Sequence, residues 1–182
     1  MEVIPANKES LRDIQIVHLT PEEWQKYKSV RLRALKEEPT AFSSSYEDAL
    51  TRPDEHWVES LAETDQKKLW HVFAKQGENI VGIVSAIREP KEKLNHVVSV
   101  FGVYVASEAR GKGVARLLME ELLKEIKANT DIVKIKLTVM STQDPAQRLY
   151  ESLGFKKIGE LKKELFINGE YIDEYLMEKI IR

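Results

Sequence analysis

The chain has 182 residues, which is enough for one domain with a sizeable core. Hydrophobic residues make up 42% of the chain and charged residues 32%. The net charge is −2, and acidic and basic residues are mixed along the chain, so no general nucleic-acid or membrane surface is indicated. Cysteine is absent, which excludes disulfides, a thiol nucleophile and a thiolate metal site.

The first part of the chain predicts one strand and one helix. Residues 12–19 have the apolar pattern of a strand. A helix should begin at Thr20, because threonine caps helices, the proline after it fits the first helical position, and a glutamate follows three residues later. It should end before Pro39. Residues 1–11 are polar and are expected to be a loose arm before a single domain over 12–182.

The middle of the chain predicts a Ser-rich loop over 39–52 and a second helix over about 53–63. Two strands should then form a hairpin around Gly77. A third strand is almost wholly apolar, as in a strand covered on both faces. The three strands are predicted at residues 69–74, 80–87 and 97–105.

The last third predicts two helices and three strands. An apolar stripe indicates a helix over 113–128, and strict alternation indicates a strand over 133–139. A helix from 144 should stop at Gly154, and a two-residue turn at Asn168 should join the last two strands, 156–167 and 171–180. The strand–helix–strand unit over 97–140 should be a parallel crossover within a mostly antiparallel sheet.

The most informative segment lies where the apolar run before Ala106 ends and the 113–128 helix begins. Gly111 and Gly113 let the backbone approach a ligand that a Cβ would keep away. The free N–H groups and positive dipole of a helix start bind phosphate, and Arg110 and Lys112 add positive charge. A phosphorylated cofactor is therefore predicted here.

Two common phosphate motifs do not fit. The P-loop lysine is followed by Ser or Thr, whereas glycine follows Lys112, and the dinucleotide fingerprint needs a small residue where Arg116 stands. Arg-x-x-Gly-x-Ala at 110–115 instead resembles the acetyl-CoA pyrophosphate loop of the GNAT superfamily of N-acetyltransferases. Ala-x-x-Leu-Tyr-x-x-x-Gly-Phe at 146–155 resembles a second segment of that family. Further similar features are Arg-x-x-Ala-Leu at 31–35 and the closing hairpin with Asp173, Tyr175 and Met177.

The resemblance implies an α+β fold, a mostly antiparallel twisted sheet of about seven strands with flanking helices and one central parallel strand–helix–strand unit. It implies direct acetyl transfer from the co-substrate acetyl-CoA to a primary amine, with no metal and with Tyr150 as the general acid. The family often has Asn where Gln143 stands, a longer amide, so the contact of this residue with the pantetheine arm is open. The expected cofactor-binding residues are Val103, Tyr104, Val105, Arg110, Gly111, Lys112, Gly113, Val114, Ala115 and Gln143.

Several alternatives stay open. Tyr150 alone would also suit a core aromatic whose hydroxyl is bonded to a backbone carbonyl. The general base is unassigned among Glu47, Asp48, His96 and a water relay. The acceptor is a small-molecule amine or a peptide amine, chosen by the loop at 39–50 and the hairpin at 165–175. A non-catalytic acyl-CoA-binding or sensing domain is the alternative function.

The remaining features predict few other partners. The four scattered histidines have no metal-ligand spacing, and no basic stripe with interleaved aromatics indicates nucleic acid. No apolar run approaches the roughly 20 residues of a membrane span, and residues 1–10 lack a secretory signal. A cytoplasmic protein is expected, with a homodimer as one option for its oligomeric state.

Overall fold

The computed structural model describes residues 13–66 and 68–182, and the arm predicted over 1–11 lies outside them. The strands are β1 (Ile14–Val17), β2 (Leu69–Gln76), β3 (Asn79–Arg88), β4 (Val97–Val105), β5 (Lys134–Met140), β6 (Lys156–Ile167) and β7 (Glu170–Ile180). The α-helices are α1 (Trp24–Glu37), α2 (Tyr46–Leu50), α3 (Asp54–Ala62), α4 (Val114–Lys127) and α5 (Asp144–Ser152). Short 3-10 helices are η1 (Pro21–Glu23), η2 (Glu63–Gln66), η3 (Glu92–Leu94) and η4 (Ser107–Ala109).

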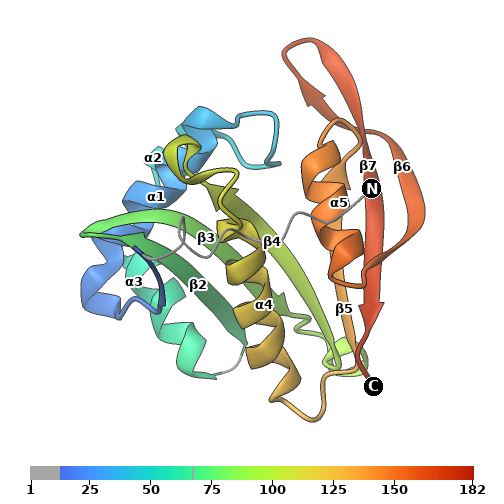
Figure 1. Ribbon diagram of the computed structural model, residues 1–182, viewed down its shortest axis with the longest axis horizontal. Helices are drawn as coiled ribbons and strands as arrows, with labels where there is room; N and C mark the ends of the chain where they lie inside the picture. The colour runs from blue at the N-terminus through green and yellow to red at the C-terminus, as the bar shows by residue number, and fades with distance from the viewer. Residues whose placement is uncertain (1–12, 67) are drawn as a thin grey trace.

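The seven strands form one sheet in the order β1-β2-β3-β4-β5-β7-β6 (Figure 1). Only β4 and β5 run parallel, and every other neighbouring pair is antiparallel. The long α4 crossover joins the parallel pair, since antiparallel neighbours need only a hairpin whereas parallel strands need a longer connection. The predicted fold class is confirmed.

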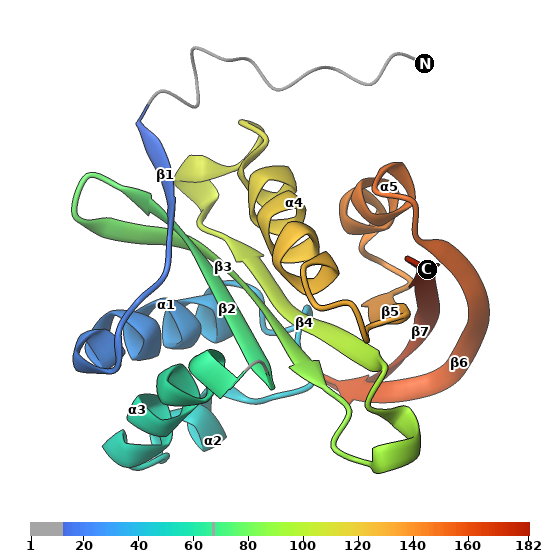
Figure 2. The same cartoon turned by 90° about the horizontal axis from the view of Figure 1, so that it is seen from below.

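The helices cover both faces of the sheet (Figure 2). Helices α1, α2 and α3 lie on one face, and α4 and α5 lie on the other. The apolar stripe of α4 is fully buried at Leu118, Leu122 and Ile126, and it packs against β2 and β3. On the opposite face Tyr27 of α1 packs edge-on against Trp57 of α3, with ring centroids 5.2 Å apart. These apolar contacts stabilise the two layers on the sheet.

The predicted loop over 39–52 contains an additional helix. The hydroxyl of Ser45 accepts a hydrogen bond of 3.0 Å from the N–H of Asp48, which caps α2. Five residues are too few to show an apolar period, so a Ser-rich sequence of this length reads as loop. The helix start predicted at Thr20 is present, although its first turn has the tighter 3-10 geometry of η1.

The parallel pair diverges after a short ladder. Only Val97 to Ser99 of β4 pair with Lys134 to Lys136 of β5. Further along β4, Gly102 has a left-handed φ of +66°, next to a register shift in β3. The facing edges of β4 and β5 beyond this point carry main-chain groups with no strand partner, so a ligand can enter between them.

Candidate active site

A cavity of about 290 Å³, the strand cavity, runs along the end of β4. It brings together seven of the predicted site residues, although they come from segments far apart in the sequence. Gly111, Lys112, Gly113 and Val114 do not line it, and they form the turn that leads into α4. The residues that line the strand cavity are Glu38, Ala41, Phe42, Val103, Tyr104, Val105, Arg110, Ala115, Gln143, Pro145, Ala146, Leu149 and Tyr150.

The turn before α4 has the geometry expected of a phosphate site. Gly111 and Gly113 have φ of +72° and +89°, a region that strains any residue with a Cβ. A Cβ on Gly111 would meet no atom within 4 Å, so the conformation of the turn, rather than crowding, requires glycine there. No side chain caps the start of α4, which leaves its first N–H groups available to an anion.

The guanidinium of Arg110 points back toward α1. Its Nε donates a hydrogen bond of 2.9 Å to the carbonyl of Val105, and its Nη1 lies 2.6 Å from Oε1 of Glu38. The positive charge expected from Arg110 is therefore paired with a carboxylate within the protein. This arrangement holds the turn against α1.

Tyr150 lies where two cavities meet. Its side chain is 6% exposed and lines both the strand cavity and a second cavity of about 110 Å³. Burial raises the pKa of its hydroxyl well above the ordinary value, which keeps the proton in place. Among the described residues none forms a hydrogen bond with this hydroxyl, unlike the core tyrosine with a bonded hydroxyl that the sequence left open.

The second cavity, the split cavity, lies between the diverging halves of β4 and β5. It contains Glu174 of β7, which burial holds at a pKa above the usual carboxyl value. The hydroxyl of Thr138 lies 3.4 Å from Oε1 of Glu174 and opposes this shift. The residues that line the split cavity are Ala41, Phe42, Val100, Phe101, Gly102, Val103, Leu137, Thr138, Val139, Met140, Gln143, Ala146, Tyr150 and Glu174.

Sequence reasoning missed Glu174. Its only local signal is alternation, because it lies between Ile172 and Leu176 on the same face of β7. Of the bases predicted from the sequence, Glu47 lines a different cavity, and Asp48 lies in the first turn of α2, where its N–H donates a hydrogen bond to the capping hydroxyl of Ser45. His96 precedes β4 at the end where β4 and β5 are still paired, away from Tyr150.

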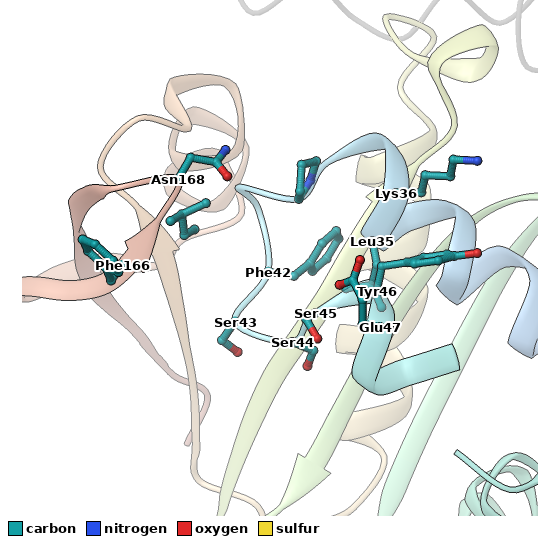
Figure 3. Close-up of a pocket in the computed structure, with 12 residues that line it drawn as sticks. Leu35, Lys36, Phe42, Ser43, Ser44, Ser45, Tyr46, Glu47, Phe166 and Asn168 are labelled. Atoms are coloured by element: carbon teal, nitrogen blue, oxygen red, sulfur yellow. The ribbon is translucent and has the colours of Figure 1, made fainter. Parts of the chain in front are cut away.

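A groove of about 610 Å³, the loop groove, lies between the α1–α2 segment and the β6–β7 hairpin (Figure 3). Phe42 and Ser43 to Ser45 lie on one side, and Phe166 and Asn168 on the other. The two segments predicted to shape the acceptor site thus border one groove. Phe42 also lines the strand cavity and the split cavity, so it lies where all three meet.

Residues 31–155 match the Acetyltransferase (GNAT) family. This range covers both sequence segments and the strand–helix–strand unit that carries the strand cavity. The chain belongs to the GNAT family. It is an N-acetyltransferase by family, as the motifs at 110–115 and 146–155 indicated.

Curated relatives and solved structures agree with this assignment. The chain is 29% identical over 150 residues to the L-amino acid N-acetyltransferase AaaT of Escherichia coli K12, covering 82% of this chain and 90% of the relative. A spermidine N(1)-acetyltransferase of Vibrio cholerae is 35% identical over 98 residues, 53% of this chain and 54% of the relative.

Among solved structures, a GNAT-family acetyltransferase of Streptococcus pneumoniae superposes with a TM-score of 0.84 at 22% identity, covering 93% of this chain and 99% of the other. The structure of yncA from Salmonella typhimurium, solved with its cofactor acetyl-CoA, superposes with a TM-score of 0.80 at 16% identity, covering 93% of this chain and 94% of the other. At these identities the superpositions show the shared fold.

The described residues carry neither a metal-ligand cluster nor a membrane-spanning helix. Within residues 13–66 and 68–182, no group of three or more His, Cys, Asp or Glu side chains is arranged to hold a metal ion. In the same part of the chain, none of the helices has the length and apolar character needed to cross a bilayer.

Proposed function

We propose that this protein transfers an acetyl group from acetyl-CoA directly to a primary amine of a small molecule or peptide. The observation that carries the proposal is the position of Tyr150 between the strand cavity and the split cavity. Acetyl-CoA supplies an activated acyl group as a thioester. The unpaired edge of β4 at Val103 to Val105 suits the pantetheine arm, and the turn at 110–115 suits the pyrophosphate.

The acceptor amine attacks the thioester carbon, a C–N bond forms, and the C–S bond breaks. Tyr150 gives its proton to the departing thiolate, and its raised pKa keeps that proton available at neutral pH. Glu174 takes the proton that the amine loses, either directly or through a water molecule. A carboxylate whose pKa is raised by partial burial is a stronger base than a fully exposed one.

The amine must lose a proton because a lysine-like amine with a pKa of about 10.4 is neutral in roughly 1 molecule in 2,500 at pH 7. The order of events is a ternary complex with no acyl-enzyme, since the sequence has no cysteine and no serine in a nucleophile motif.

The test is the release of free CoA from acetyl-CoA in the presence of a broad panel of amines. Tyr150→Phe should lower kcat by about 10²-fold or more, the range of a positioned general acid, and leave the calorimetric Kd for acetyl-CoA unchanged. Tyr27→Phe is the matched control, because Tyr27 is equally buried at 6% exposed but lies on the other face of the sheet. Tight binding with no turnover on any amine would instead favour a non-catalytic acyl-CoA-binding domain.

A further inference from the structure

Arg31 of α1 is a cation without a counter-ion beside the split cavity. Its Nη1 is closed off from solvent and has no hydrogen-bond partner among the described residues. No carboxylate of the described chain forms an ion pair with it, although the neighbouring arginines 33 and 110 are both paired. A buried donor without a partner costs free energy, so such an atom calls for a ligand.

Arg31 lies directly behind two residues that line the split cavity, Phe42 and Gly102. Its guanidinium carbon lies 4.7 Å from the ring centroid of Phe42, which holds the plane of the group. Its Nη1 lies 3.8 Å from where a Cβ on Gly102 would be. Phe42 and Gly102 both line the split cavity, together with Tyr150 and Glu174.

A second unpaired cation lies close by. Arg52 lines a cavity of about 320 Å³, the side cavity, which shares Phe101 with the split cavity. Its Nη1 lies 2.9 Å from Nε2 of His56, whose pKa is lowered by burial and by Arg52 itself. The acidic residues of the side cavity, Glu59 and Glu63, form no ion pair with either arginine.

We propose that the acceptor of this enzyme is an amine that carries a carboxylate, such as a free amino acid, and that Arg31 binds this carboxylate. The planar guanidinium fits a carboxylate through two parallel hydrogen bonds. With the carboxylate at Arg31, on the Gly102 side of the split cavity, the amine of a small amino acid faces Glu174 and Tyr150 across the cavity. The positive charge of Arg52 adds to the preference for acceptors that carry a carboxylate. It also repels polyamines, which carry only positive charge.

This inference rests on the proposed acetyl transfer and narrows its acceptor. The test compares kcat/KM for each of the twenty L-amino acids with kcat/KM for its α-carboxamide, which keeps the amine and side chain and loses the negative charge. For the best substrate, the acid should exceed its amide at least tenfold, and about a hundredfold if the contact is bidentate.

Arg31→Met keeps much of the side-chain volume and removes the charge. It should remove the preference for the acid and leave the rate with the amide within about twofold, while Arg31→Lys should keep part of the preference. The control is Lys28→Met, which removes one positive charge from the same helix at a position that lines neither the loop groove nor the strand, split and side cavities, and it should change neither rate. Calorimetry with acetyl-CoA shows that each variant is folded.

Equal rates for acid and amide in the unmodified enzyme, or faster acetylation of spermidine, would overturn the carboxylate preference while leaving acetyl transfer intact. An equal loss on acid and amide in Arg31→Met would also overturn it, because a charge-specific contact cannot slow the amide. If Arg31→Met does not fold, the acid-to-amide ratio of the unmodified enzyme decides the question. Absence of turnover on every amine would count against the proposed function itself.

Discussion

Arg33 of α1 holds Glu108 of η4 through two parallel hydrogen bonds of 2.8 and 2.7 Å. Glu108 lies just before the turn at 110–115, so this pair ties the proposed phosphate-binding turn to α1. Arg33 holds the pKa of Glu108 at about 2, and Glu108 contributes most to the raised pKa of Arg33. The pair is charged at every pH where the protein is expected to work.

Arg33→Ala should therefore weaken acetyl-CoA binding by loosening the turn. Both side chains are more than a third exposed, so screening limits the effect to roughly two- to fivefold in the Kd for acetyl-CoA, with kcat nearly unchanged. Isothermal calorimetry at low and high salt measures the Kd of the variant and of the parent protein. High salt should reduce the difference between the two Kd values, because it screens the ion pair. The exposed Lys124–Glu121 pair of α4 is the control, and Lys124→Ala should leave the Kd unchanged. A fall in kcat without a change in Kd would show that the pair acts elsewhere.

Glu174→Gln should lower kcat by about 10²-fold or more, because the amide cannot accept the proton of the amine. Activity requires the carboxylate, so it is lost as the pH falls through the pKa of Glu174. Burial raises that pKa, which places the acid limb of the kcat profile above the usual carboxyl range. The acceptor is kept at saturating concentration, so that the pH profile of kcat reports the pKa of Glu174 in the enzyme–substrate complex.

Thr138→Val provides the companion measurement, because the hydroxyl of Thr138 lowers the pKa of Glu174. The acid limb should move to higher pH in this variant while the maximal rate changes little. An unchanged kcat profile in Glu174→Gln would return the role of base to a water relay or to Glu47.

His71 should make the fold sensitive to acid. It is 2% exposed, with Nδ1 2.7 Å from Oγ of Ser85 and Nε2 3.0 Å from Oγ of Ser60. Burial, with Arg31 as a second cause, lowers its pKa from 6.5 to about 4. The unfolded chain binds the proton more tightly, so the free energy of unfolding should fall by about 3 kcal/mol as the pH drops from 6.5 to 4.

Urea unfolding at a series of pH values measures this slope. His71→Gln should reduce stability at neutral pH but flatten the slope, whereas His96→Gln, at an exposed position, serves as the control for changes in the other groups. The same slope in His71→Gln as in the parent protein would assign the acid sensitivity to the carboxylates.

Features that depend on neighbouring residues alone could be predicted from the amino-acid sequence. The order of strands and helices follows from apolar periods, and the turn at Gly111 and Gly113 follows from a left-handed conformation that glycine favours. The motif that contains Tyr150 is contiguous, at residues 146–155, so it could also be found from the sequence. The α2 helix was not predicted from the sequence, because the five residues that follow its cap Ser45 are too few to show an apolar period. Apolar periods, helix caps and turn conformations depend on residues a few positions apart, so they are visible as patterns in the sequence.

The surroundings of Tyr150 depend on contacts between distant parts of the chain and could not be predicted from sequence patterns. Glu174 reaches the split cavity because β7 pairs with β5 in a register that sets Glu174 opposite Met140. Arg31 lies beside Gly102, although some seventy residues separate them in the chain. A one-residue shift in strand register would turn Glu174 to the opposite face of the sheet. Long-range register and helix packing fix these positions, and no local spacing records them.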